Sequence, residues 1–529
     1  MKKILNISIV LILILGISGC KKSYLDINND PNSATSSTPQ LILPAVLTNI
    51  GGNYMTYFNY GAYMAGYMAN AGGYSFVGST TITYNYNNSS NTGLFTSAYS
   101  DLRSIQYIIT STKDAPQYVL YNSVARILKS YYFQLLVDEY GNVPYSEALL
   151  GADNVTPHYD NASTIYQSLV TEIDAAIVQL KAHGSSTSVT GLAGSDIMFG
   201  GSATKWIQFA NNIKLRILIR AQKGSLAAFT STAFNTFSSE GFLLDDVLIQ
   251  PGYVSTAARQ NPLWNSYQST YTNAAVGQST IPTTWMYTFY DGTKISDASR
   301  GALIYRTFAA STKVRGQLGS DNNPVWGSAP NWYVGTGTGA SSTEARGLLK
   351  SRVMGMLIFP AAETYFLLAE AALNGHVLAG SASDNFDNGI KASYNYLMKS
   401  GTTLTSSTTT VLNDYLTAYK AANTANYLVN YSAATSDAQR LEAIITQKYI
   451  ALNFVDGFEA WQEYKRTGYP AVSGTSATTT FASTQSVGTT PDKLPVRSLY
   501  PTTEYNLNPN VPAAAGVNAW TSKIFWDVN

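Results

Sequence analysis

The stretch IITQKYIALNFVDGFEAWQEYKRTGYP, from Ile444 to Pro470, predicts two helices joined by a tight corner. Apolar side chains recur three or four residues apart before the corner, which places one stripe on one helix face; they are Leu441, Ile444, Ile445, Tyr449 and Leu452. Gly457 interrupts this run, and Phe458, Trp461 and Tyr464 then put rings on one face until Gly468 and Pro470 end the second helix. The stretch is therefore predicted to be a helical hairpin built on aromatic side chains.

The start of this hairpin carries a second local signal. Ser436 is placed to cap the first helix, and Gln439, three residues later, is placed to reach back to it. This reciprocal capping box satisfies backbone amides that the first turn of a helix leaves without partners.

Other stretches repeat the helical pattern, and we predict helices at residues 41–50, 54–67, 121–140, 165–182, 205–220, 360–374 and 386–399. Residues 54–67 carry a ring every three or four residues. The arginines Arg216 and Arg220 are predicted to reach carboxylates of neighbouring helices rather than a ligand. Residues 474–490 are rich in Ser and Thr and are predicted to form a surface loop.

Several motifs in this order resemble one known family. The chain carries GNVPYSEA at 141–148, KWIQFANNIKLRILIR at 205–220, GFEAW at 457–461, KRTGYP at 465–470 and LPVRSLYP at 494–501. Together they resemble the SusD/RagB family of outer-membrane, nutrient-binding lipoproteins. The resemblance implies a mainly α, single compact fold in which degenerate tetratricopeptide-type helix pairs scaffold an irregular, loop-rich ligand-binding region.

The N-terminus reads as a lipoprotein signal. Lys2 and Lys3 precede an apolar run over residues 4–17, which is too short to span a bilayer core of ~30 Å at ~1.5 Å per residue. Ser18 and Gly19 then precede Cys20, the only cysteine, in the manner of a bacterial lipobox. We therefore expect a signal peptide at 1–19, a tether at 20–40 lipidated on Cys20, and a SusD-like domain at 41–529.

Composition excludes some functions. Charged residues make up 12% of the chain, about half the usual share, and the net charge of +1 becomes −1 once Lys2 and Lys3 are removed. This charge leaves no basic footprint for nucleic acid. The chain has 38 tyrosines and 8 tryptophans, whose rings suit stacking on sugars or on peptide backbones.

Catalysis and metal binding are not expected. The three histidines, His158, His183 and His376, are not spaced as a ligand pair. Asp138 and Glu139 are adjacent on a helix, so their side chains diverge by ~100° and cannot flank one bond. We predict no catalytic residue, no metal site and no cofactor.

An acid-rich turn near the N-terminus is also not expected to bind metal. Asp26, Asn28 and Asp30 alternate like the start of a calcium loop, but Pro31 stands where such a loop requires glycine.

Two segments hold the candidate ligand residues. Residues 72–92 are poor in charge and rich in Tyr and Asn, and in proteins of this resemblance the loop at this position contributes to the ligand face. Residues 250–345 lose helical periodicity, which in a compact protein usually indicates a functional segment. The candidates are Tyr84, Tyr86, Asn87 and Asn88 in the first segment, and Trp264, Tyr267, Trp285, Tyr287, Trp326, Trp332 and Tyr333 in the second.

The resemblance implies a lipid-anchored binder on the outer membrane, facing the cell exterior. It would capture an oligomeric nutrient, with a glycan favoured by the stacking rings, and pass it to a SusC-type TonB-dependent transporter. Two alternatives remain open: an oligopeptide-capturing relative, and a non-catalytic scaffold or adhesion protein.

Overall fold

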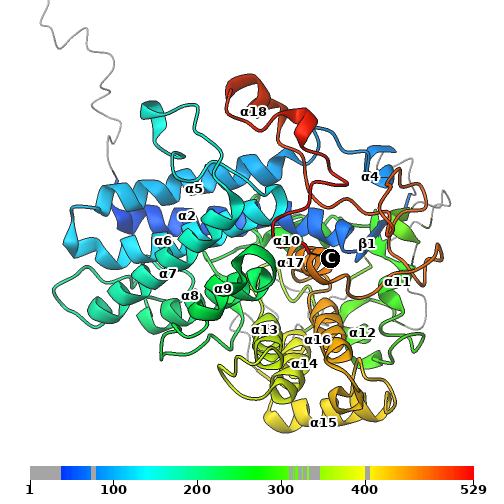
Figure 1. Cartoon of the computed structure of the whole chain (residues 1–529). Coiled ribbons are helices and arrows are strands. Elements are labelled where there is room, and N and C mark those ends of the chain that lie inside the picture. The colour runs from blue at the N-terminus through cyan, green and yellow to red at the C-terminus, as the bar shows by residue number, and fades with distance from the viewer. Residues whose placement is uncertain are drawn as a thin grey trace, which may run out of the picture.

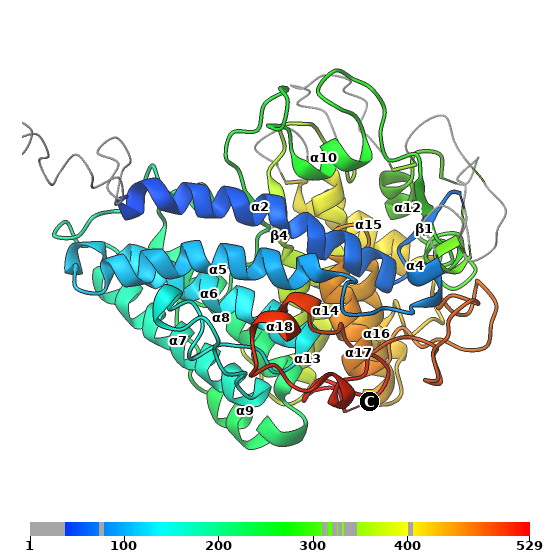
Figure 2. The same ribbon diagram turned by 90° about the horizontal axis from the view of Figure 1, so that it is seen from above.

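Antiparallel helices form most of the computed structural model, which describes residues 37–72, 79–308, 314, 316–319, 325, 331–332, 346–399 and 406–528. The first group of helices comprises α2 (Pro39–Met64), α5 (Thr92–Thr112), α6 (Val119–Tyr140), α7 (Ala162–His183) and α8 (Ala203–Ala221). Consecutive members from α5 to α8 pack on each other, and α2 lies against α5 (Figures 1 and 2).

A second group of helices follows an irregular middle segment. It comprises α13 (Ala361–Leu373), α14 (Ala382–Met398), α15 (Thr409–Ala421), α16 (Asp437–Ala451) and α17 (Gly457–Thr467). Helix α13 packs on α8, which joins the two groups, and α17 returns to pack on α2. The mainly α fold built from helix pairs is thus confirmed, and α2 and α17 close the bundle.

Short elements decorate this scaffold. Strand β1 (Met68–Asn70) pairs antiparallel with β3 (Thr280–Pro282), with Ala69 opposite Ile281, and β2 (Val247–Ile249) pairs antiparallel with β4 (Met356–Phe359). The short helices are α4 (Ser79–Thr83), α9 (Ala227–Ala233), α10 (Pro262–Tyr267), α11 (Thr284–Tyr287), α12 (Ala298–Ile304) and α18 (Thr502–Leu507). Single 3-10 turns occupy Pro116–Tyr118, Gly151–Asp153, Gly224–Leu226, Gln317–Gly319, Tyr431–Ala433 and Ala514–Gly516.

The predicted hairpin is confirmed as α16 and α17. The Ser436 hydroxyl caps α16 by accepting a bond from the Gln439 amide at 3.3 Å. The Gln439 side chain, however, accepts the backbone N–H of Thr435 at 2.7 Å, so the predicted return bond to Ser436 was wrong by one residue. At the other end, Gly468 ends α17 in the left-handed conformation, with φ of 71°, as expected of a C-terminal glycine.

Gly457 has a different role from the predicted one. The chain turns at Phe454, whose φ is 58°, and Gly457 is already the first residue of α17. A Cβ atom on Gly457 would lie 2.4 Å from the Ala62 nitrogen, and one on Gly61 would lie 2.1 Å from the Phe458 nitrogen. Glycine is required at both positions because the backbones of α2 and α17 touch there.

A buried ionic network holds the two helix groups together. The Arg220 guanidinium on α8 lies 2.5 Å from Glu459 and 3.0 Å from Glu463, both on α17, and also pairs with Asp138 on α6. Arg216 lies 3.3 Å from Glu363 on α13. The prediction that Arg216 and Arg220 serve structure by reaching neighbouring carboxylates is confirmed.

Glu363, one member of this network, is expected to make the stability of the protein depend on pH. Burial, reinforced by the nearby Glu459 carboxylate, raises the pKa of Glu363 to about 8. Between its ordinary pKa near 4.5 and pH 8, the unfolded chain releases this proton while the folded chain keeps it, so the contribution of Glu363 to stability falls as pH rises. The Glu363→Gln side chain cannot ionise.

We therefore expect the free energy of unfolding of Glu363→Gln, minus that of the unsubstituted chain, to rise by about 4 kcal/mol between pH 4.5 and pH 8. Urea unfolding of both proteins at several pH values measures this difference. A difference that stays constant with pH would show that Glu363 is already ionised in the folded protein.

Candidate ligand-binding site

A cavity of about 430 Å³ opens where the C-terminal half of α2 meets α4 and the start of α5. Figure 2 shows these three elements side by side. We call it the tyrosine cavity; its lining residues are Thr56, Asn59, Tyr60, Tyr63, Thr81, Tyr86, Asn91, Gly93 and Leu94. Its volume lies within the range of small-molecule sites.

Helix α2 supplies one wall of the tyrosine cavity. Thr56, Asn59, Tyr60 and Tyr63 are three or four residues apart, so their side chains share one face of the helix. All four are half-buried, which leaves part of each side chain open to the cavity. The opposite wall follows a left-handed turn at Asn91, with φ of 54°, a conformation that asparagine tolerates.

Polar contacts behind the wall fix two of these side chains. The Tyr60 hydroxyl donates to the buried carboxylate of Glu139 at 2.6 Å, and Ser498 donates to the same carboxylate at 2.8 Å. The Tyr267 hydroxyl donates to Asn59 Oδ1 at 2.5 Å. The Asn59 Nδ2 group is therefore turned away from Tyr267 and is able to donate to a ligand.

The tyrosine cavity is electrically neutral. Among the described residues that line it, none is a lysine, arginine, histidine or carboxylate. Burial, reinforced by Glu139, raises the pKa of Tyr60 well above its ordinary value, and burial also raises the pKa of Tyr63 and of Tyr86. The three phenols therefore stay protonated, and their rings add no charge to the cavity.

The structure brings one predicted residue of the 72–92 segment, Tyr86, into this cavity. Asn87 and Asn88 lie beside it but do not line it: Asn87 Oδ1 accepts the Ser89 amide at 2.8 Å, and Asn88 Nδ2 donates to the Tyr500 carbonyl at 2.7 Å. These bonds hold the loop, and a ligand contact by either residue stays a prediction.

The structure contradicts the predicted ligand contact of Tyr84. Its side chain is buried in the core, and its hydroxyl accepts the Ser483 amide at 3.3 Å. The backbone at Tyr84 is left-handed, with φ of 53°, and the buried Tyr84 ring packs edge to face against Tyr86, with 6.3 Å between ring centroids, while Tyr86 lines the cavity.

The structure also contradicts the predicted ligand contacts of four rings in residues 250–345. Trp264, Tyr267, Trp285 and Trp332 are at most 6% exposed, so the prediction that they offer open faces to a ligand was wrong. They pack against other rings. The ring centroid of Trp332 lies 3.9 Å from that of Phe454, and the ring centroid of Trp285 lies 5.4 Å from that of Phe289. An irregular segment has no helix face to bury, and these rings provide its core instead.

The remaining predicted residues divide into two groups. Tyr287 is half-buried, with its ring 5.3 Å from that of Phe308, and it does not line the tyrosine cavity. Trp326, Tyr333 and the lipidation candidate Cys20 lie outside the described residues.

The prediction missed most of the α2 wall. The signal was present, because Tyr60 and Tyr63 belong to the run of rings recognised at residues 54–67. The alternation between buried and half-buried rings along α2 could not be read from that run alone, since Tyr54 and Tyr57 in the same helix are buried.

Two further features concern only the described part of the chain. There, no helix is both long and apolar enough to cross a membrane. In the same residues, no three histidine, cysteine, aspartate or glutamate side chains are grouped so that they could hold a metal ion.

The helix-pair scaffold thus carries an open cavity of tyrosines and amides whose described lining holds no charged side chain. A family profile described as "Starch-binding associating with outer membrane" matches residues 29–274, and a second, "Susd and RagB outer membrane lipoprotein", matches residues 334–527. The chain belongs to the SusD/RagB family.

Solved structures share this fold. A SusD homolog from Bacteroides uniformis aligns with a TM-score of 0.68 and 23% identity over 92% of this chain and 99% of its own. A chitin-binding SusD homolog from Flavobacterium johnsoniae aligns with a TM-score of 0.65 and 21% identity over 91% and 99%. A SusD homolog from Bacteroides vulgatus aligns with a TM-score of 0.70 and 19% identity over 93% and 98%. A comparison with curated proteins gave no match.

Proposed function

We propose that this protein is a non-catalytic, lipid-anchored binder that captures a neutral oligosaccharide in the tyrosine cavity and passes it to a SusC-type TonB-dependent transporter. The observation that carries the proposal is the cavity itself, which combines three tyrosines and two amides without a charged group. Tyrosine rings stack on the apolar faces of sugars, while hydroxyl and amide groups bond to sugar hydroxyls. Relatives support the ligand class, since two of the similar structures are chitin-binding proteins and one matching profile is described as starch-binding.

The absence of charged side chains in the lining of the tyrosine cavity predicts which oligosaccharides bind. A sugar carboxylate or sulfate placed in this cavity would lose water without gaining a positive partner, and the buried carboxylate of Glu139 lies directly behind Tyr60. Neutral oligosaccharides are therefore expected to bind better than acidic ones.

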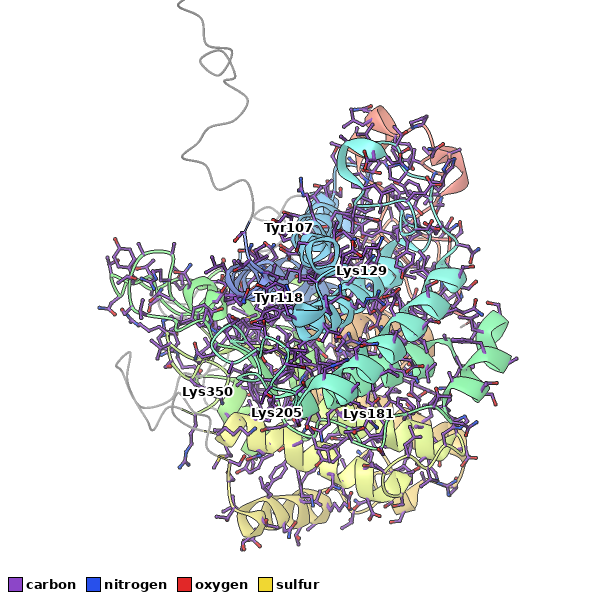
Figure 3. The ribbon with its side chains drawn as sticks, turned by 90° about the vertical axis from the view of Figure 1, so that its left-hand side faces the viewer. Tyr107, Tyr118, Lys129, Lys181, Lys205 and Lys350 are labelled. Atoms are coloured by element: carbon purple, nitrogen blue, oxygen red, sulfur yellow. The ribbon has the colours of Figure 1, made fainter. Side chains whose placement is uncertain are left out.

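The position of the cavity suits transfer from a tethered protein. The described chain begins at Ser37, whose amide donates to the Tyr107 hydroxyl on α5 at 3.2 Å, on the face shown in Figure 3. From Pro39 to Tyr60, helix α2 rises about 32 Å. A tether that starts at an acylated Cys20 would thus join the fold at the end of α2 opposite to the cavity.

Two substitutions test the cavity. Tyr63→Ala and Tyr86→Ala are each expected to weaken binding of chitohexaose or maltohexaose about 10-fold, because each removes a stacking ring worth about 1 kcal/mol or more. Titration calorimetry on the mature chain measures the loss. Tyr107→Ala, which removes an exposed tyrosine far along α5, is the matched control and is expected to leave the affinity unchanged.

The same titrations separate the alternatives. Binding of oligopeptides but of neither hexaose would replace the glycan proposal with peptide capture. Failure to bind either class, with transporter association retained in a pull-down, would identify a scaffold and contradict the proposal.

A further inference from the structure

A second cavity, lined by other residues, has no part in the proposal above. Its volume is about 650 Å³, and it lies between α17 and the segments 471–496 and 523–527. We call it the loop cavity. The Ser/Thr-rich stretch 474–490, predicted as a plain surface loop, supplies much of its wall.

The wall of the loop cavity is fixed by hydrogen bonds rather than left as a free loop. The Ser473 amide donates to the Thr479 carbonyl at 2.9 Å, and the Thr479 hydroxyl donates back to the Ser473 carbonyl at 2.6 Å. Further along, the Val487 amide donates to the Thr83 carbonyl at 3.1 Å, which ties the loop to α4. The buried hydroxyl of Tyr84, which accepts the Ser483 amide, is a third tie. A preformed wall lowers the entropy cost of binding.

The charged groups around the loop cavity are already paired within the protein. Lys465 donates to Glu139 at 3.2 Å, and Asp492 accepts from the Tyr464 hydroxyl at 3.1 Å. Lys493 donates to the Gly488 carbonyl at 3.1 Å. At the rim, Lys523 and Asp527 lie 3.5 Å apart. Each charged side chain that lines the cavity therefore already has a hydrogen-bond or ion-pair partner within the protein.

Hydroxyl groups and apolar surfaces remain for a ligand. Thr480 and Ser483 are only 5% and 3% exposed, and their hydroxyls accept backbone amides at 3.0 and 3.1 Å, so these two side chains fix the wall rather than reach a ligand. The Thr490 hydroxyl donates to the Leu494 carbonyl at 3.0 Å and keeps its lone pairs to accept. Pro491 and Pro495 add apolar surface. A fixed acceptor between apolar patches matches the two-sided chemistry of a sugar ring.

We propose that the loop cavity is a second binding site for a neutral saccharide, separate from the tyrosine cavity. The inference rests on the proposed function for its ligand class, but its residues and its walls are independent of that site. Two sites on one chain would let successive parts of one oligomer bind together, which raises the effective concentration at the second site.

One lining position allows the loop cavity to be blocked from its rim. Ser473 is exposed and lines the cavity, so Ser473→Trp is expected to fill it without disturbing the core. Gln485→Trp is the matched control, because Gln485 is exposed on the same loop and does not line the cavity. The thermal midpoint of each variant verifies that it is folded.

Calorimetry with chitohexaose and with maltohexaose measures the number of sites. We expect two sites in the unsubstituted chain and in Gln485→Trp, and one in Ser473→Trp. Amide hydrogen exchange supplies a second readout: residues 473–490 are expected to exchange several-fold more slowly on addition of the bound hexaose, also in Tyr86→Ala, and this protection is expected to vanish in Ser473→Trp.

The outcomes distinguish the two proposals. A single site that is weakened about 10-fold in Tyr86→Ala and unaffected by Ser473→Trp would overturn the loop cavity and leave the proposed function intact. A single site lost only in Ser473→Trp would support the loop cavity and overturn the tyrosine cavity as the binding site. Absence of binding to either hexaose would overturn both proposals.

Discussion

Replacing Arg220 with methionine is expected to lower the free energy of unfolding by about 3–5 kcal/mol. The guanidinium is the shared partner of three buried carboxylates, those of Asp138, Glu459 and Glu463. Methionine fills a similar volume but leaves these carboxylates without their common cation in the interior. The cost arises mainly at Asp138, which loses its cation, because Glu459 keeps Lys448 and Glu463 keeps Arg466 as partners.

Denaturant unfolding of the variant measures this loss. Arg103→Met on α5 is a matched control, since Arg103 is exposed, and it is expected to change stability by less than about 0.5 kcal/mol. If Arg220→Met were as stable as the unsubstituted chain to within about 1 kcal/mol, the ionic network would not be what joins α6, α8 and α17.

The second large effect is expected from Gly61→Ala. The new Cβ atom would lie 2.1 Å from the Phe458 nitrogen and 2.3 Å from the Gly457 carbonyl carbon, and neither backbone atom is able to move without shifting α17. We expect α2 and α17 to separate, with a loss of more than about 3 kcal/mol of stability or failure to fold. Because Thr56, Asn59, Tyr60 and Tyr63 lie on the same helix, a folded variant should also bind glycan less tightly.

Gly52→Ala is the control within the same helix. A Cβ atom at Gly52 meets nothing within 4 Å, so alanine there is expected to stabilise the protein by up to about 1 kcal/mol. Thermal unfolding of both variants tests the contrast. Equal midpoints for Gly61→Ala and Gly52→Ala would show that the α2 and α17 backbones do not need to touch.

Most of the long helices could be predicted from the sequence because their signals are local, although α5 and α15 were not predicted. Apolar side chains at helical spacing identified α6, α7, α8, α13 and α14, and a capping serine followed by a ring-bearing face identified the hairpin α16 and α17. The two strand pairs were missed, since each strand has three or four residues and its partner lies more than 100 residues away. The close backbone contact that requires glycine at position 457 was also missed. Helix α2, which makes this contact, lies nearly 400 residues earlier in the chain.

The ligand site was only partly predictable for a related reason. A tyrosine in a weakly charged segment has the same sequence signal whether it forms core or lines a cavity. Tyr84 and Tyr86 are two residues apart, yet one is buried and the other lines the tyrosine cavity. The tryptophans of residues 250–345 were predicted as ligand residues because helical periodicity fades there. A segment without a helical apolar face needs large side chains for its core, and the described tryptophans fill that role.

A crystal structure of the mature chain soaked with chitohexaose or maltohexaose tests the central claim most directly. The account predicts sugar rings in the tyrosine cavity, against Tyr63 and Tyr86, with a hydrogen bond from Asn59 Nδ2. An oligosaccharide bound only elsewhere on the protein, or an empty tyrosine cavity at millimolar ligand, would contradict it.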